Sequence, residues 1–488
     1  MSEPVRFVSR GQVVTVGPDV PHTMTALEYL RLRLRRTGSK EGCAEGDCGA
    51  CTVVVGELAD DGNLRYRAVN ACILLVHQLD GHALFTVDDL AEEDGRLHPV
   101  QQAMVDAHGS QCGFCTPGFV MSLFAYFRGH DRADAEELKD CLAGNLCRCT
   151  GYRPILEAGE RMFALAGGST DRFAAGEAAL ATQLQGLARS RMLRHSTPDG
   201  DFLAPETPED LAETLATLPE GENWILAGGT DVGLWITKQR RNPRSIVSIG
   251  RIAALRRITD HGDAIEIGAG ATYSDAFAAI ESLHPDFARM VRRLGSVQIR
   301  NSGTIGGNIA NGSPIGDSMP ALIALGARLA LRSRAGRREM PLEDFFLAYR
   351  RTALQPGEFV ESVTVRKPAA DSRFAVYKLS KRFDQDISAV LAAFHLRLDG
   401  GIVREARIAF GGMAGIPARA PKTEAALAGL SFTPAAIEPA VAALAADYTP
   451  MTDMRASAAY RLLAAQNLLR KFCHEVNAGG KIGVEAAE

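Results

Sequence analysis

The sequence lacks any apolar run approaching the ~18 residues of a membrane-spanning helix. Its first residues, MSEPVRFVSRGQ, also lack the apolar segment of a secretory signal. There is no large excess of one charge, because 54 Lys and Arg stand against 58 Asp and Glu, a formal net charge of −4. Bulk electrostatic attraction to nucleic acid or to an anionic membrane is therefore not expected.

Disulfides are not expected either, although the chain has ten cysteines. With no signal and with cysteines at metal-ligand spacings, a reducing cytoplasm is the predicted compartment. Cys141 and Cys473 lie outside these spacings and are predicted to be small core residues. The other eight cysteines fall into two sets of four before residue 150.

The first set has the spacing C-x4-C-x2-C followed by a more distant fourth cysteine, which is the plant-type [2Fe–2S] pattern. Glycines before and between its members allow tight folding, so that backbone N–H groups can point at cluster sulfurs. A zinc site or a redox dithiol is the alternative, but zinc favours paired C-x2-4-C knuckles. The set comprises Cys43, Cys48, Cys51 and Cys72, with Gly42, Gly46 and Gly49 in its loop.

The second set pairs a C-x2-C with a C-x-C farther along the chain. Alone, a C-x2-C could be a zinc knuckle or a thioredoxin-like pair. In combination with the C-R-C, and with each pair placed before a predicted helix whose N-terminus favours anionic thiolates, a second [2Fe–2S] site is predicted. Its members are Cys112, Cys115, Cys147 and Cys149.

Local patterns predict the order of elements around these cysteines. A hairpin is expected at 5–8 and 13–16, then a helix that begins with a Thr25–Glu28 capping box and ends before Gly38 as C′ residue. Strands at 52–55 and 83–87 complete a small ferredoxin-type domain. Four helices are expected within 98–166, three with proline in the first turn and one capped by Asp134.

Farther along, an Ala-, Gly- and Ser-rich segment at 167–194 is interpreted as a linker. Short strands alternate with helices and glycine-rich turns over 195–368. Strand-like runs at 374–379, 387–398 and 403–410 then precede helical stretches. At 488 residues the chain should hold roughly three or four domains.

Two glycine-rich segments carry the remaining chemistry. AGGTD (227–231) follows the apolar strand WIL, and TIGGNIANGSPIGD (304–317) lies about seventy-five residues later. Exposed backbone N–H groups suit a pyrophosphate, and Asn308 and Asp317 can supply polar contacts. Each segment alone could be a structural turn. Downstream of two one-electron sites, together they favour a flavin, which exchanges electrons singly or in pairs.

The motifs CAEGDCGACTV, SQCGFCTPGF, AGNLCRCTGYRPI, ILAGGTDVG, TIGGNIANGSPIGD and KRFDQDIS resemble those of the molybdenum hydroxylase (xanthine oxidase) family over nearly the whole chain. The likeness is to the small iron–sulfur/FAD subunits of bacterial xanthine dehydrogenases. It implies a multidomain α+β fold. The parts would be a β-grasp [2Fe–2S] ferredoxin domain (1–88), a four-helix-bundle [2Fe–2S] domain (89–166), a linker (167–194), a vanillyl-alcohol-oxidase-type FAD-binding domain (195–370) and a C-terminal α/β domain flanking the flavin (371–488).

By matching motif positions, the resemblance implies a set of cofactor contacts. Gln111, beside Cys112, would reach toward a molybdopterin held by a partner. The flavin contacts would be Ile225, Leu226, Ala227, Gly228, Gly229, Thr230, Asp231, Val232, Thr304, Gly307, Asn308, Asp317, Val360 and Lys378. No hydroxylation residue is expected in this chain.

The function that the resemblance implies is electron transfer for a xanthine dehydrogenase. Electrons from xanthine or hypoxanthine would reach FAD through two [2Fe–2S] clusters and leave to NAD. The molybdopterin-binding large subunit would be a separate chain in an (αβ)2 heterotetramer, with no nucleic acid or membrane partner. The alternatives are the same role for an aldehyde, nicotinate or other N-heterocycle hydroxylase, a redox-sensing protein, and a diaphorase without a molybdenum partner.

Overall fold

The computed structural model describes residues 2–481 except 60, 93, 168–170 and 220, so parts of the predicted linker and C-terminal domain lie outside the described residues. The chain forms two compact units, residues 1–253 with 295–303 and residues 254–294 with 304–488. Each unit is described by itself. Among the described residues, none of the helices combines the length and apolar character that a bilayer-spanning segment needs.

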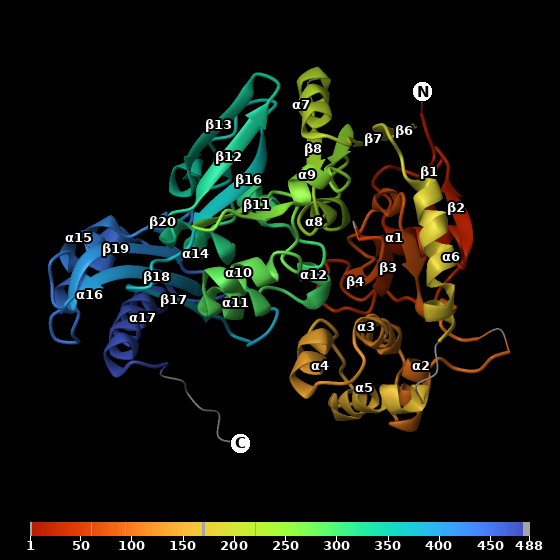
Figure 1. Cartoon of the computed structure of the whole chain (residues 1–488), viewed down its shortest axis with the longest axis horizontal. Helices are drawn as coiled ribbons and strands as arrows, with labels where there is room; N and C mark the ends of the chain where they lie inside the picture. The colour runs from red at the N-terminus through yellow and green to blue at the C-terminus, as the bar shows by residue number, and fades with distance from the viewer. Residues whose placement is uncertain (1, 60, 93, 168–170, 220, 482–488) are drawn as a thin grey trace. The chain divides into compact units, whose positions relative to one another are not determined.

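The first unit begins with a mixed sheet of strand order β2-β1-β5-β3-β4, in which β1 and β5 are parallel and the other neighbours antiparallel. With one helix on its face this is the β-grasp arrangement, as predicted (Figure 1). Its elements are β1 (Val5–Ser9), β2 (Gln12–Val16), α1 (Ala26–Glu28), β3 (Thr52–Leu58), β4 (Leu64–Asn70) and β5 (Ala83–Phe85).

The helix of this domain begins as predicted and ends differently. Thr25 and Glu28 form the capping box, but α1 passes into a π-helical turn at Tyr29–Arg33 that is capped by Leu34. The prediction that Gly38 is the C′ residue is therefore wrong. The Gly38 N–H instead donates to the Asp88 carboxylate at 3.2 Å, a tertiary bond that no local pattern encodes.

Four helices follow in the predicted region and share one buried core. Proline occupies the first turn of three of them, and the Asp134 carboxylate caps the other by accepting from the N–H groups of Glu136 and Glu137. The helices are α2 (Pro99–Asp106), α3 (Thr116–Gly129), α4 (Ala135–Leu142) and α5 (Arg153–Ala166). Cys141 is buried on α4, as expected of a core residue.

The predicted linker contains a helix, α6 (Arg172–Leu187), that weak periodicity did not indicate. Leu184 and Leu187 pack it against Val8 and Ala83 of the N-terminal sheet (Figure 1). The chain then forms a second sheet of order β6-β7-β9-β8. Its elements are β6 (Leu193–Thr197), β7 (Gly200–Ala204), α7 (Pro208–Thr217), β8 (Asn223–Leu226), α8 (Val232–Thr237) and β9 (Ser245–Ser248), and α12 (Val297–Arg300) also belongs to this unit.

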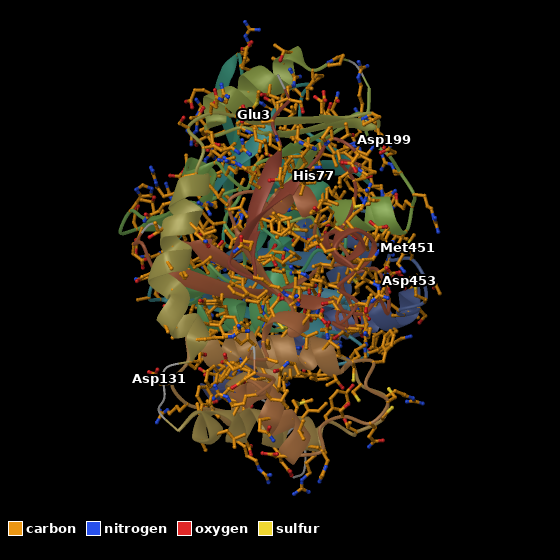
Figure 2. All side chains as sticks on the ribbon, turned by 90° about the vertical axis from the view of Figure 1, so that its right-hand side faces the viewer. Glu3, His77, Asp131, Asp199, Met451 and Asp453 are labelled. Atoms are coloured by element: carbon orange, nitrogen blue, oxygen red, sulfur yellow. The ribbon has the colours of Figure 1, made fainter. Side chains whose placement is uncertain are left out.

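One hydrophobic core joins the two sheets of the first unit. Phe7 and Leu27 of the β-grasp part belong to the same buried cluster as Phe202 and Ile246 of the second sheet. His77 lies in the interior (Figure 2), with its ring 5.0 Å from the His195 ring and 5.2 Å from the Phe202 ring. These parts therefore pack as one body.

The second unit holds a five-stranded sheet of order β10-β11-β16-β12-β13, a four-stranded sheet of order β17-β18-β19-β20 and the two-stranded sheet β14-β15. The strands are β10 (Ile258–Asp260), β11 (Ala264–Gly268), β12 (Arg328–Ser333), β13 (Gly336–Pro341), β14 (Phe346–Ala348), β15 (Arg351–Thr352), β16 (Phe359–Arg366), β17 (Ser372–Leu379), β18 (Val390–Asp399), β19 (Ile402–Gly411) and β20 (Ala418–Arg419). The helices are α9 (Ala253–Arg256, of which the first residue belongs to the first unit), α10 (Phe277–Leu283), α11 (Pro285–Arg292), α13 (Ile305–Asn311), α14 (Ser318–Ala324), α15 (Pro421–Leu427), α16 (Glu438–Asp447) and α17 (Ala458–Ala478).

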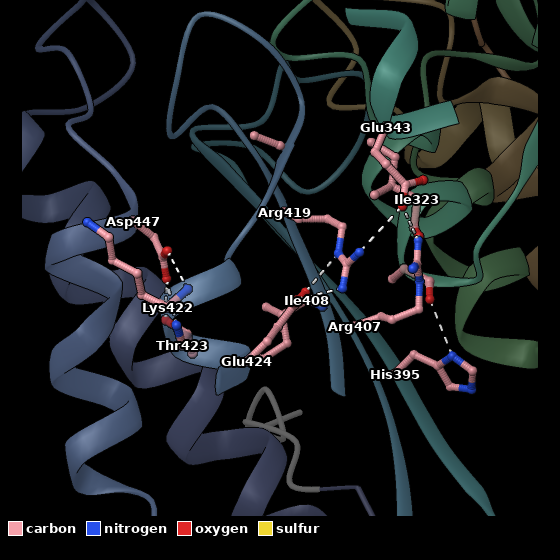
Figure 3. A network of polar contacts seen from close by, with 12 residues as sticks. Ile323, Glu343, His395, Arg407, Ile408, Arg419, Lys422, Thr423, Glu424 and Asp447 are labelled. Carbon is pink, nitrogen blue, oxygen red and sulfur yellow. Dashed lines mark hydrogen bonds and ion pairs between the residues drawn. The ribbon is translucent and has the colours of Figure 1, made fainter. Parts of the chain in front are cut away.

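Charged groups connect the sheets of this unit. Glu343 accepts from Arg407 on β19 at 2.7 Å, and Arg419 lies between Glu343 and Glu424 (Figure 3). Glu424 on α15 also accepts from the Ile408 N–H at 2.7 Å. The strands predicted from residue 374 onward are thus joined to the 3-10 turn Leu342–Phe345 that follows β13. Cys473 on α17 is fully buried, as predicted.

Candidate redox and flavin sites

The first cysteine set is assembled by the β3–β4 hairpin. Thr52 pairs with Asn70 in this hairpin, so Cys51 before β3 and Cys72 after β4 lie at the same end. Their backbones meet there, because the Ala71 N–H donates to the Cys51 carbonyl at 3.3 Å. Both residues are buried.

Cys43 and Cys48 come from the glycine-rich loop that precedes β3. The N–H groups of Asp47 and Cys48 donate to the Cys43 Sγ at 3.4 and 3.3 Å. The thiols are also joined to one another: Cys43 contacts Cys48 and Cys72, and Cys72 contacts Cys51. Hydrogen bonds from the Cys48 and Cys72 thiols lower the pKa of Cys43.

The second set lies at the end of the helical bundle, where Cys115 is the N-cap of α3. Cys115 contacts Cys147, and Cys112 contacts Cys149. Cys112 and Cys149 are exposed. Burial, followed by the hydrogen bond with Cys147, raises the pKa of the Cys115 thiol to about 12.

The groups around the Cys147 sulfur favour its thiolate form. The N–H groups of Cys149 and Thr150 approach its Sγ at 3.4 and 3.5 Å, and the Thr150 hydroxyl lies 3.3 Å away. Desolvation acts to raise the pKa of Cys147, but the Thr150 side chain and these N–H groups outweigh it and lower the pKa to about 7.

Sequence reasoning missed Tyr152 at this site. Its Oη accepts from the Cys147 N–H at 3.0 Å, and its backbone has φ of 69°, a conformation that a non-glycine residue adopts rarely. Such strain is found where the surrounding structure holds a functional loop in place. The aromatic residue after Gly151 was visible in the sequence, but its positive φ was not.

The two sets fit groups that take four thiolates each. In the described part of the chain, no three His, Cys, Asp or Glu side chains are placed to hold a single metal ion. The thiols of the second set approach one another in two pairs, and those of the first set form one series of contacts, Cys48–Cys43–Cys72–Cys51. A [2Fe–2S] cluster takes four cysteine ligands divided between two irons. Amides directed at Cys43 and Cys147 supply the hydrogen bonds to sulfur that anionic clusters use.

We expect about four iron atoms and four acid-labile sulfides per chain, as two spectroscopically distinct [2Fe–2S] centres. Changing Cys43 to Ser should remove or cripple one centre and leave the other, because the sets share no ligand. Iron analysis with electron paramagnetic resonance (EPR) measures this. Cys473→Ser, the same change outside both sets, is the control. Zinc in place of iron, or one [4Fe–4S] centre, would contradict the assignment.

The AGGTD segment lies in the first unit, in the turn between β8 and α8. A Cβ on Gly228 would lie 1.6 Å from the Ser302 carbonyl oxygen, so only glycine fits there. Gly229 has φ of +78°. These two adjacent positions carry no side chain, which lets the backbone approach a pyrophosphate there.

This turn also packs on the chain that follows Cys72. The Gln78 side chain donates to the Ala227 carbonyl at 3.3 Å, and a Cβ on Gly233 would lie 2.7 Å from the Ile73 Cβ. Ile73 is the residue next to Cys72. The first cysteine set and the predicted phosphate turn are therefore neighbours within this unit.

The remaining predicted flavin contacts lie in the second unit. Thr304 caps α13 by accepting from the Gly307 N–H at 3.0 Å. Asn308 accepts from the Tyr273 hydroxyl at 3.0 Å and from the Ser318 hydroxyl at 2.9 Å. Val360 is buried on β16. Side-chain hydrogen bonds thus hold the glycine-rich segment at Thr304 and at Asn308.

Two of the predicted flavin contacts, which are far apart in the sequence, meet in this unit. Lys378 on β17 is paired with Asp317, which precedes α14, and also donates to the Ser388 hydroxyl at 3.0 Å. Ser388 in turn donates to Asp317 at 2.6 Å. All three are buried. Ser388 is the last residue of the motif KRFDQDIS, but the sequence analysis did not name it as a site residue. This buried group of a lysine, a carboxylate and a hydroxyl can supply hydrogen bonds to a polar edge of a cofactor.

Three family models match consecutive parts of the chain. A [2Fe-2S] binding domain matches residues 86–160, and the FAD binding domain in molybdopterin dehydrogenase matches residues 197–368. The CO dehydrogenase flavoprotein C-terminal domain matches residues 375–476. The cysteine set 112–149 and both glycine-rich segments fall within these matches.

Individual relatives agree. Xanthine dehydrogenase of Drosophila subobscura is 34% identical over 86% of this chain and 35% of its own length. Aldehyde oxidase 4 of Cavia porcellus is 32% identical over 84% of this chain and 34% of its own length. The chain thus spans about a third of these curated relatives. A carbon monoxide dehydrogenase chain from Hydrogenophaga pseudoflava is 31% identical over 55% of this chain and 94% of its own, with a TM-score of 0.53.

Proposed function

We propose a function on one premise: the chain belongs to the molybdenum hydroxylase (xanthine oxidase) family, as an electron-transfer component with iron–sulfur and FAD-binding domains. We infer that it serves a xanthine dehydrogenase in the cytoplasm, between a partner molybdopterin subunit and NAD. The alternative is the same role for an aldehyde, nicotinate or other N-heterocycle hydroxylase. One relative named aldehyde oxidase 4 favours keeping that alternative.

The single observation that carries the electron-transfer role is the placement of the two cysteine sets. When bound, clusters carry single electrons and a flavin exchanges them singly or in pairs. The set containing Cys43 lies beside the phosphate turn through Ile73 and Gly233, whereas Cys112 and Cys149 of the other set are exposed. One set is thus near the flavin residues and the other is open to a partner.

The exposed set also carries the surface that we assign to the molybdopterin subunit. Phe114 between its first two cysteines is 48% exposed, and Tyr152 is 38% exposed. Gln111, also exposed, lies beside Cys112 on the same loop. Exposed aromatic side chains around a functional group are typical of a protein interface.

The proposed flavin contacts of the two units have different roles. Gly228 and Gly229 give backbone access for a pyrophosphate, with Ile225–Val232 as the surrounding contacts. Thr304, Gly307 and Asn308 are the proposed flavin contacts within the second glycine-rich segment. Asp317, Lys378 and Val360 are proposed to contact the flavin itself, with Ser388 fixing the Lys378 ammonium.

The organisation of the chain supports xanthine over carbon monoxide. Two proteins named xanthine dehydrogenase each align with this chain in one continuous match, over 86% and 97% of its length. Each match includes the iron–sulfur and flavin regions together. The carbon monoxide dehydrogenase chains match only 55–56% of it while being covered almost completely. The fused order of domains is therefore shared with the proteins named xanthine dehydrogenase.

Purifying the native complex and measuring xanthine-dependent NADH formation tests the proposal. We expect turnover with xanthine and hypoxanthine and little with an aldehyde or nicotinate. The isolated chain should reduce an artificial dye with NADH yet leave xanthine unchanged. Turnover of an aldehyde or nicotinate alone would favour the alternative, and co-purification with no larger subunit would favour a diaphorase.

A further inference from the structure

Four buried polar side chains meet between the two cysteine sets within the first unit. They come from four separate parts of the chain and are at most 2% exposed. We call them the polar bridge: Thr52, Ser122, Asn145 and Gln298. Only Gln298, on the four-residue helix α12, comes from outside the iron–sulfur part.

The bridge is continuously hydrogen-bonded. The Gln298 Nε2 lies 3.0 Å from the Ser122 hydroxyl, 3.1 Å from the Asn145 Oδ1 and 3.3 Å from the Thr52 hydroxyl. Ser122 donates to the Asn145 Oδ1 at 2.6 Å. The Asn145 amide donates to the Gly49 carbonyl at 3.1 Å, and so does the Thr52 hydroxyl at 2.6 Å.

Three members of the bridge lie near a cysteine of one set along the chain, and Gln298 joins them from outside. Thr52 follows Cys51, and Gly49 follows Cys48. Asn145 comes two residues before Cys147, and Ser122 lies two turns into the helix that Cys115 caps. Gln298 contacts side chains from both sets at once, through Thr52 for the first and through Ser122 and Asn145 for the second.

The backbones also touch at this place. The Leu146 N–H donates to the Cys48 carbonyl at 3.0 Å, which joins a neighbour of Cys147 directly to a ligand of the first set. Glycines permit the approach. A Cβ added to Gly118 would lie 2.1 Å from the Gly49 carbonyl oxygen, and one added to Gly49 would lie 2.2 Å from the Gly144 carbonyl oxygen. A Cβ added to Gly144 would lie 2.0 Å from the Gln298 Oε1.

A buried polar network of this kind fixes the distances and angles between its members more than it raises the stability of the fold. Replacing hydrogen-bonded partners by apolar groups of the same shape can be nearly neutral in stability, whereas hydrogen bonds restrict distance and angle. Networks that are largely satisfied rigidify a core. The bridge is therefore suited to holding two loops in one relative position.

We propose that the polar bridge consists of positioning residues that fix the separation of the two cysteine sets, with Gln298 as its central donor. This rests on the proposed function, because the separation matters only if each set holds a cluster. Helix α12 is followed by Ser302 and Gly303, which lie against Gly228 of the predicted phosphate turn. The same helix would then also govern the spacing of the two iron–sulfur sites.

Gln298→Leu tests this in the full chain, since it keeps the side-chain volume and removes the donor. With both clusters reduced, magnetic coupling between them splits or broadens their EPR signals and falls with the inverse cube of their separation. We expect wild-type iron content and two intact individual spectra, with loss or a marked change of the coupling. Ser122→Ala, a smaller change in the same network, should act in the same direction and covers the case in which Gln298→Leu does not fold.

Asn301→Leu is the matched control. Asn301 also lies at the end of α12 and donates to the Ala68 carbonyl at 3.0 Å, but it does not touch the second cysteine set through that bond. Its coupling should be unchanged. If both bridge variants keep full iron and show the same coupling as wild type, the positioning role of the bridge is overturned and the proposed function is unaffected. If the wild-type chain shows no pair of [2Fe–2S] centres, the proposed function fails instead.

Discussion

Replacing Cys147 by Ser should abolish xanthine-to-NAD turnover in the complex while NADH-to-dye activity stays largely intact. Cys147 belongs to the exposed set, at the end open to the partner, whereas the phosphate turn lies beside the other set. Loss of this thiolate should disable the partner-facing site only. Steady-state assays of both activities on one preparation, with iron analysis, give the measurement.

Cys141→Ser is a demanding control, because Cys141 lies in the same helical bundle, donates to the Ser122 carbonyl at 3.3 Å and belongs to neither set. It should retain both activities. A Cys147 variant that still couples xanthine to NAD at a near-normal rate would remove the second set from the path. The order of carriers proposed for this chain would then be wrong.

Gly228→Val should cause loss of FAD with both iron–sulfur spectra retained. A Cβ at this position would lie 1.6 Å from the Ser302 carbonyl oxygen and 2.9 Å from the Gly303 nitrogen, which are backbone atoms and cannot rotate away. The turn must shift, and a turn that no longer presents its N–H groups cannot hold a pyrophosphate. FAD released per chain on denaturation, together with EPR of the clusters, measures the effect.

Gly250→Val supplies the comparison for this substitution. Gly250 follows β9 of the same sheet, and the nearest atom to a Cβ there is the Ser248 Oγ at 3.8 Å, an ordinary contact. Its FAD content should match wild type. FAD occupancy near the wild-type level in the Gly228 variant would reject the phosphate-turn assignment. Loss of iron as well would mean that the damage extends beyond the turn.

Features with a local physical cause were predictable from the sequence. The Thr25–Glu28 capping box and the Asp134 cap are formed as predicted, because their donors and acceptors are three residues apart or fewer. The cysteine sets were visible as spacings. Their assembly follows from the register of one hairpin and the starts of two helices.

Features that depend on distant partners were not predictable. The helix after Thr25 ends at a π-helical turn while Gly38 bonds to Asp88, fifty residues away. Helix α6 has two buried side chains, Leu184 and Leu187, too few to give a clear period. Gln298 lies on a helix of four residues, and its role depends on neighbours from three other segments. No pattern within a short window could identify it.

The core shared by the two sheets of the first unit has a consequence during synthesis on the ribosome. Leu84 of the β-grasp part packs in the same cluster as Ile246, which is made roughly 160 residues later, about 8–30 s at ~5–20 residues per second. The N-terminal apolar face therefore emerges long before its cover. Nascent chains halted before β9 should bind chaperones and be cut readily by protease, and those extended past it should not.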